Sequence, residues 1–253
     1  EGRLRRIAFA QLAQPGTKAD EKSARLPEDE LGRLSRAIPL WFAETFYFCP
    51  SYAAVAAVGI RTPPEGQAES HHVAFGAEWT TENLRQLVET SGEPLDYIVT
   101  GAVRAVAGDY EVTLRIWEVK TFRERKSFNV RWTPSTADTA LTSLHTQLRT
   151  YMEWSPASAA FAYVIPAQPR AWLETLGASL GLFLVDKAIL ARDQLAPVEA
   201  DLRDAAQRAP AGEAASFAFL TLRQRAVKLG FEAPTDATLA RSPLVAQASR
   251  LPS

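Results

Sequence analysis

The stretch from Asp96 to Thr121, DYIVTGAVRAVAGDYEVTLRIWEVKT, decides the fold. Every second residue is apolar in its first half and again in its second half, and Gly108-Asp109 stands between the two halves. A period of two is typical of a β-strand with one buried face, and a Gly-Asp pair favours a tight turn. The stretch therefore predicts a β-hairpin whose shared buried residues are Val99, Val103, Val112, Leu114 and Ile116.

The next segments extend this hairpin into a meander closed by a helix. Residues 126–132, KSFNVRW, alternate as a third strand with Phe128, Val130 and Trp132 on one face. A helix follows, for which Ser135 and Asp138 are expected to form a capping box. Its expected apolar stripe consists of Leu141, Leu144, Leu148 and Met152.

The residues before the hairpin predict two strands and two helices. Buried strands are expected within 5–13 and 51–60, where short apolar runs end at Pro or Gly. A helix should begin at Asp29 and be kinked or restarted at Pro39, and a second should begin at Thr80 and stop at Gly92. The predicted fold class is α/β (α+β), with the order β-α-β-α-β-β-β-α, a mixed sheet and an antiparallel meander.

The remainder of the chain predicts an all-α helical domain. Apolar residues recur at helical spacing in three segments, and no 34-residue period is present, so a degenerate array of helical hairpins is expected. The predicted division is an α/β domain over 1–154, a linker over 155–169 and a helical domain over 170–253. The apolar positions are Trp172, Leu173, Leu176, Leu180, Phe183 and Leu184, then Leu195, Val198 and Leu202, then Phe217, Leu220 and Val227.

Composition limits the classes of function. The chain has 28 Lys plus Arg against 29 Asp plus Glu, which offers no overall attraction for nucleic acid or anionic lipid. Its single cysteine, Cys49, excludes an intrachain disulfide and is expected to be buried and inert. The sequence opens without Met, so further residues could precede Glu1. Those residues could include a signal peptide, an anchor or an output domain.

The residues that could take part in catalysis or metal binding are expected to have structural roles instead. His71-His72, with Glu69 before and Glu78 after, could supply zinc ligands, but adjacent histidines on extended backbone point apart and a solvated polar loop is favoured. His145 flanks the stripe of its helix, where packing and chemistry are both open. Nucleophile-elbow, phosphate-loop, dinucleotide and metalloprotease motifs are missing from the sequence. We therefore predict a protein that is not an enzyme, with no catalytic residue, cofactor or metal.

With these elements in place, the segment from about Arg5 to Tyr151 resembles the TolB amino-terminal-like domain, an α/β module of bacterial envelope and signalling proteins. The resemblance rests on a hydrophobic-x-x-Gly-x-Val pattern, then Gly-Asp, then alternating hydrophobic residues. Many relatives have Thr-Gly after the second strand, where this chain has Thr121-Phe122, so that turn is expected to be built differently. The residues that carry the pattern are Ile98, Gly101, Val103, Gly108, Asp109, Val112, Leu114 and Ile116. In several relatives this module is followed by tetratricopeptide helices.

Three classes of function remain open. The first is a protein-protein interaction or assembly module of a bacterial envelope-associated or accessory protein, with the periplasm favoured over the cytoplasm. The second is a regulatory region of a larger signalling protein, such as a cyclase or transcription activator, and the third is an enzyme with an unfamiliar site. For the first class, Trp172 and Phe219 are the expected contacts for a protein partner. Arg123 and Arg125 are expected to contribute a modest basic face together with Arg104 and Arg115.

Overall fold

The computed structural model describes residues 3–16, 28–61, 71–158, 163–195, 197–209 and 212–233. Five strands form a mixed sheet in the order β2-β1-β5-β6-β7. Strand β1 pairs in parallel with β2 and β5, whereas β5, β6 and β7 form an antiparallel meander. The strands are β1 (Arg5–Ala10), β2 (Tyr52–Ala57), β5 (Tyr97–Val106), β6 (Asp109–Glu118) and β7 (Arg123–Trp132). The predicted α/β fold class, with its mixed sheet, is thereby confirmed.

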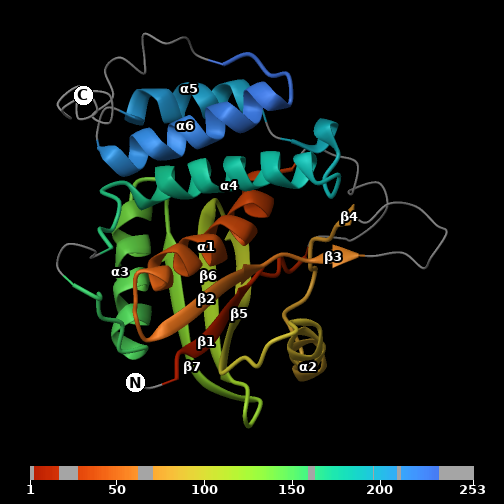
Figure 1. The fold of residues 1–253 in the computed structure, drawn as a ribbon, viewed down its shortest axis with the longest axis vertical. Coiled ribbons are helices and arrows are strands. Elements are labelled where there is room, and N and C mark those ends of the chain that lie inside the picture. The colour runs from red at the N-terminus through yellow and green to blue at the C-terminus, as the bar shows by residue number, and fades with distance from the viewer. Residues whose placement is uncertain are drawn as a thin grey trace.

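The helices lie in layers on this sheet, as Figure 1 shows. Helices α1 (Glu30–Tyr47) and α3 (Ala137–Tyr151) pack with the sheet around one hydrophobic core. Helix α4 (Pro169–Asp186) lies between α1 and the outer pair α5 (Val198–Arg208) and α6 (Glu213–Lys228) (Figure 1). A short 3-10 helix, η3 (Arg192–Gln194), precedes α5.

A small two-stranded sheet lies beside this framework and was missed from the sequence. It pairs β3 (Ile60–Arg61) with β4 (His71–His72), so the histidine pair predicted to lie in a loop belongs to a strand. The connection then continues into α2 (Thr81–Thr90), which begins at the predicted Thr80 cap. Strands of two residues carry too little periodic pattern to be distinguished from a loop.

The predicted hairpin is confirmed, with one change at its turn. Val103 pairs with Val112 and Val99 with Ile116, and all of the residues predicted to be buried together lie in the core. The turn itself is Ala107-Gly108, because Asp109 is already the first residue of β6. Both turn residues have positive φ, 53° and 88°, which is the backbone of a two-residue type I′ hairpin loop.

Gly101 stands where β5, β6 and the end of β1 come closest. A Cβ atom at this position would lie 1.8 Å from the carbonyl oxygen of Thr113. The carbonyl of Gly101 also accepts the backbone N–H of Ala13 at 2.9 Å, which joins the segment after β1 to the middle of β5. The glycine of the motif therefore permits a close backbone approach that no side chain would allow.

Helix α1 continues through Pro39, so the helix does not restart there, which was one of the two predicted outcomes. It begins at Asp29, whose Oδ1 accepts the N–H of Gly32, and continues to Tyr47. Proline removes the N–H that would bond the carbonyl of Ser35. That carbonyl instead accepts the N–H of Leu12 at 2.9 Å, so the hydrogen bond lost within the helix is replaced by one to the segment after β1.

Two other local predictions are wrong. Helix α3 has Thr136 at its N-cap position with no side-chain cap bond, and Asp138 accepts the N–H of Arg170 at 2.8 Å instead of forming a capping box with Ser135. In α6, the buried positions include Phe219, Leu222 and Ala226, whereas Phe217 and Val227 face outward. Apolar residues lie on more than one side of α6, so spacing alone selected the wrong stripe.

The buried apolar residues form two clusters, and α4 contributes to both. Leu173 belongs to the core between the sheet, α1 and α3, whereas Ala178 and Leu182 belong to the core with α5 and α6. The elements described after α3 are helices. The division at 155–169 stays a prediction; residues 159–162 of that linker and 234–253 of the helical part lie outside the described residues.

Candidate functional site

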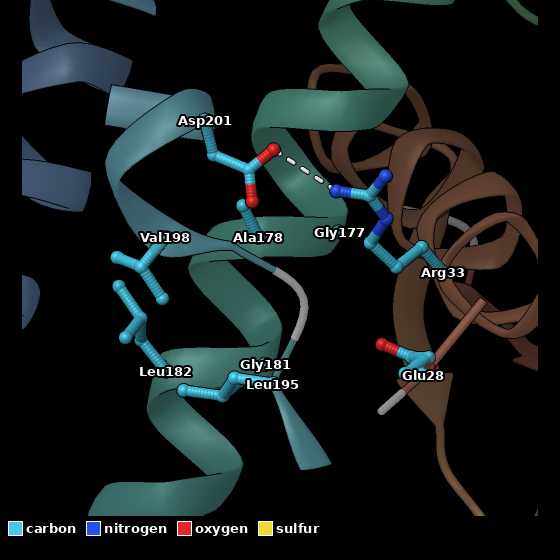
Figure 2. Close-up of a pocket in the computed structure, with 9 residues that line it drawn as sticks. All are labelled: Glu28, Arg33, Gly177, Ala178, Gly181, Leu182, Leu195, Val198 and Asp201. Atoms are coloured by element: carbon cyan, nitrogen blue, oxygen red, sulfur yellow. Dashed lines mark hydrogen bonds and ion pairs between the residues drawn. The ribbon is translucent and has the colours of Figure 1, made fainter. Parts of the chain in front are cut away.

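Polar side chains converge where α1, α4 and α5 meet, around a small cavity shown in Figure 2. Arg33 on α1 donates from Nη1 to Oδ1 of Asp201 on α5 at 2.9 Å, passing beside α4. The cavity has a volume of about 10 Å³, which is room for about one water molecule. Its other lining residues are Glu28, Gly177, Ala178, Gly181, Leu182, Leu195 and Val198. An organic substrate does not fit there, and the contact joins helices.

Small residues of α4 make this close approach possible. A Cβ atom at Gly177 would lie 3.4 Å from the Cβ of Arg33, and one at Gly181 would lie 3.0 Å from Cδ2 of Leu195. The glycines thus let α1 and the segment before α5 pack directly against the α4 backbone. The run GASLGLF, starting at Gly177, thus serves close helix packing.

A buried ion pair lies next to this cavity. The guanidinium of Arg36 is fully buried and donates through both of its Nη atoms to the carboxylate of Glu28, from Nη2 to Oε2 at 2.6 Å. Burial raises the pKa of Glu28, and the charge of Arg36 opposes that rise. Arg36 Nε has no hydrogen-bond partner among the described residues. Because a buried charge left without its partner is strongly destabilising, the pair holds the segment before α1 in place.

A second polar cluster centres on Gln11, directly after β1. Its Oε1 accepts the N–H of Gly59 and contacts Nε2 of His72, both at 3.0 Å, and its Nε2 donates to the carbonyl of Val73. Burial lowers the pKa of His72 to about 3, with a contribution from the positive charge of Arg36. His72 is therefore a neutral hydrogen-bonding residue that ties β4 to β1, while His71 is exposed.

A third cluster holds a partly buried carboxylate against aromatic residues. Oε2 of Glu44 accepts the indole N–H of Trp172 at 2.9 Å and the hydroxyl of Tyr163 at 3.1 Å, and that hydroxyl accepts the indole N–H of Trp41. Burial raises the pKa of Glu44, and its two hydrogen bonds oppose the rise. The cluster joins α1 to α4 through the half-buried Trp172.

His145 completes the set of buried titratable groups. Its ring stacks on Trp41 and Phe42, and its Nε2 lies 2.8 Å from Oγ1 of Thr45. Burial lowers the pKa of His145 to about 3. The side chain is fully enclosed in the core, which favours the packing role among the two that the sequence left open.

The residues expected to contact a partner lie in different environments. Phe219 is 0% exposed in the helical core, so in this conformation it offers no surface to a partner. Trp172 is half-buried and hydrogen-bonded to Glu44. Arg123 and Arg125 are exposed on β7, far along the chain from both aromatic residues. The structure does not bring the four together, and their role in binding stays a prediction.

Neighbouring carboxylates neutralise two of the four arginines of the predicted basic face. Arg104 pairs with Glu111 at 3.0 Å, and Arg115 pairs with both Glu78 and Glu124. These residues lie on the face of the meander opposite its apolar core, and Glu78 reaches it from the segment before α2. Arg104 and Arg115 therefore stabilise the sheet surface through exposed ion pairs.

Sequence reasoning missed Glu44, Arg36 and the exposed Phe217. A signal for the first two was present, since both charges fall between apolar positions of a helix that contains Leu34, Ile38 and Trp41. Such charges are expected to find partners when the helix is buried on several sides. Phe217 was placed in the apolar stripe of its helix but is 67% exposed.

Comparisons with known proteins give a partial structural likeness. No protein-family model and no curated protein sequence matches this chain. TolB from Acinetobacter baumannii has 9% identity and a TM-score of 0.33, with 62% of this chain and 30% of that chain covered. A PelC dodecamer from Paraburkholderia phytofirmans has 13% identity and a TM-score of 0.32, with 60% and 89% covered. A lipoprotein from Neisseria meningitidis has 9% identity and a TM-score of 0.30, with 58% and 95% covered. This chain thus spans less than a third of that TolB, and identities this low do not transfer a function.

The described residues offer neither a membrane-spanning helix nor a cluster of metal ligands. No described helix combines the length and apolar character needed to cross a membrane. Within the same residues, no three His, Cys, Asp or Glu side chains are grouped in a way that could hold a metal ion.

Proposed function

We propose that this protein is a protein-protein interaction module, not an enzyme, and that it contacts its partner through the outer helix α6. The observation that supports this proposal is Phe217, an aromatic side chain that is 67% exposed on that helix. Large aromatic residues supply much of the binding free energy in protein interfaces because they remove a large apolar area from water. The partner surface is expected to offer an apolar pocket for this ring.

The arrangement of the helices supports the same proposal. Helix α4 is held from below by α1, so that α5 and α6 form the outermost layer (Figure 1). Arg225 of α6 donates to the carbonyl and hydroxyl oxygens of Ser179 on α4, at 3.0 and 2.7 Å. A rigidly held helix presents an anchor side chain with little loss of conformational entropy on binding.

The partly buried carboxylates support a structural reading of the remaining polar groups. Glu28, Asp201 and Glu44 each bond to a side chain of this chain: the contact of Asp201 joins α5 to α1, that of Glu44 joins α1 to α4, and that of Glu28 joins the segment before α1 to α1. In the proposed function they hold the helices in position and take no part in proton transfer. The envelope setting rests on the sequence resemblance in β5 and β6, and the partner belongs to that compartment.

The proposal is tested by replacing two phenylalanines of the same helix, one exposed and one buried, by alanine. The wild type, Phe217→Ala and Phe219→Ala are used to recover partners from the native host, with mass spectrometry and thermal unfolding of each variant. Phe217→Ala is expected to keep the melting temperature and to bind the recovered partner at least about tenfold more weakly, as loss of an interface anchor does. Phe219→Ala should destabilise the fold by about 3 to 5 kcal/mol because it empties a core position. Unchanged partner binding by Phe217→Ala would contradict the proposed surface.

A further inference from the structure

Strand β2 lies at one edge of the five-stranded sheet, and one side of its backbone is unpaired among the described residues. It pairs with β1 alone among the described strands. The N–H of Arg5 donates to the carbonyl of Ser51, and the N–H of Gln11 donates to that of Ala57, so the odd-numbered residues of β2 face β1. Ala54 and Ala56 therefore direct their N–H and C=O groups away from the sheet. No described residue bonds to those four groups.

The two edges of the sheet differ in their protection. The other edge, β7, begins with the charged run Arg123, Glu124, Arg125 and Lys126, which hinders pairing with another strand. Strand β2 has the sequence YAAVAA, without charge, proline or bulge, and Val55 is 53% exposed on it. A regular, uncharged edge is a template for an additional strand.

We propose that the additional strand is β2 of a second copy of this chain, paired antiparallel across a two-fold axis at Val55. In that register, Ala54 of each copy faces Ala56 of the other, and both residues already point their hydrogen-bonding groups outward. Each such antiparallel pair exchanges two N–H···O bonds. Val55 faces Val55 of the second copy as a β-branched cross-strand pair, in a position where the side chains lie close.

The composition of the strand favours a second copy over an unrelated peptide. A two-fold axis places Val55 opposite its own copy and brings every residue near the axis close to its own copy, so a charge there would lie close to a like charge. No charged residue occurs between Tyr52 and Ile60. Exposed apolar residues also lie at both ends of the strand, with Tyr47 and Phe48 before it and Ile60 after it. Antiparallel pairing brings the end with Phe48 of one copy toward the end with Ile60 of the other.

Introducing a charged residue of either sign at Val55 tests the two-fold pairing. Sedimentation is measured for the wild type, Val55→Lys, Val55→Glu and an equimolar mixture of the two variants, with thermal unfolding to establish that each is folded. The wild type should form a dimer that dissociates on dilution, each variant alone should be monomeric, and the mixture should recover the dimer, since unlike charges then face each other. Val227→Lys is the matched control, because Val227 is an apolar residue of similar exposure, 50%, on α6, and it should dimerise as the wild type does.

Two results would overturn the proposal. One is a wild type that stays monomeric up to submillimolar concentration, which would leave the edge to a different strand or to none. The other is a dimer that persists in Val55→Lys and Val55→Glu alike. Ala56→Pro is a second variant, because proline removes an outward N–H without removing a bond to β1; a folded, dimeric Ala56→Pro would also count against the pairing.

Discussion

Ala107 holds a left-handed backbone in a hairpin turn for which asparagine or glycine is the usual residue. Its φ is 53°, its side chain is exposed, and it precedes Gly108 in the β5–β6 loop. Phe122, in the next turn, has a φ of 48°, so this chain keeps a glycine-like backbone where the family resemblance led us to expect a differently built turn. Left-handed backbone disfavours residues with a Cβ by about 1 to 2 kcal/mol.

Because the backbone of Ala107 is strained, replacement by glycine should change the stability of the fold differently at Ala107 than at Ala105. Ala107→Gly and Ala105→Gly add similar freedom to the unfolded chain, but only the first relieves a positive φ. Ala107→Gly should therefore be more stable than Ala105→Gly by about 1 to 2 kcal/mol in urea unfolding. Equal stability of the two variants would show that the turn is unstrained.

His145 predicts a loss of stability in acid. Burial lowers its folded pKa from 6.5 to about 3, so between these values the unfolded chain binds a proton that the folded chain does not. The stability contributed by neutral His145 is complete above pH 6.5 and is lost as the pH falls, by about 1.4 kcal/mol per pH unit. Because the pKa of His72 is lowered in the same way, His145→Gln should remove only about half of the pH dependence of unfolding that the two histidines share in this range. An acid limb as steep in His145→Gln as in the wild type would contradict this assignment.

Among the elements, the β5–β6 hairpin was the most predictable, because its two strands alternate strictly over long runs, although the alternation did not predict that Ile98, Thr100 and Ala102 on the second face of β5 are buried as well. Helix α1 was also predictable in its position but not in its continuity, since the partner of the Ser35 carbonyl is Leu12, more than twenty residues away. The α3 cap failed for a similar reason: Asp138 bonds to the start of α4. Local pattern predicts an element, whereas its ends and bends depend on contacts made by distant residues.

The hairpin face itself can be tested at Leu114. This residue is buried against the α1 and α3 side of the sheet and pairs with Gly101. Leu114→Ala should lower the free energy of unfolding by about 2 to 5 kcal/mol because it removes buried methyl groups and leaves a cavity. Thr113→Ala, on the opposite face, is the control and should cost far less. If Leu114→Ala left the free energy of unfolding nearly unchanged, the face of the hairpin assigned here to the core would be wrong.

At the scale of the whole molecule, α4 is the element that joins the sheet to the outer helices. It is held to α1 by Glu44 with Trp172 and by Glu30 with Arg170, and Arg33 of α1 reaches past it to Asp201. None of these pairs could be predicted from the sequence, because each links residues more than a hundred positions apart and depends on how α4 lies across α1. The helices could be predicted one by one, but the site between them could not.

These contacts predict the behaviour of a chain cut within 155–169. Limited proteolysis is expected to cleave first there or in residues 18–30, most of which lie outside the described residues, and the domain division predicts that the fragments stay folded. Because α4 is bonded to α1, the two fragments should elute together in size-exclusion chromatography and separate only in denaturant. Fragments that separate under native conditions would contradict the role of α4, and early cleavage within 97–132 would contradict the domain division.

The central claim is that function lies on the outer helix and that the partly buried carboxylates between the helices only hold that helix in place. The most direct measurement is partner affinity for the wild type, Phe217→Ala and Glu44→Gln, with a melting temperature for each. Glu44→Gln keeps an oxygen that can accept the hydrogen bonds of Trp172 and Tyr163, so it should bind the partner as the wild type does. Phe217→Ala should lose binding while its melting temperature is unchanged. Binding abolished by Glu44→Gln in a fully folded protein, with Phe217→Ala unaffected, would contradict the account and assign the function to the carboxylate of Glu44.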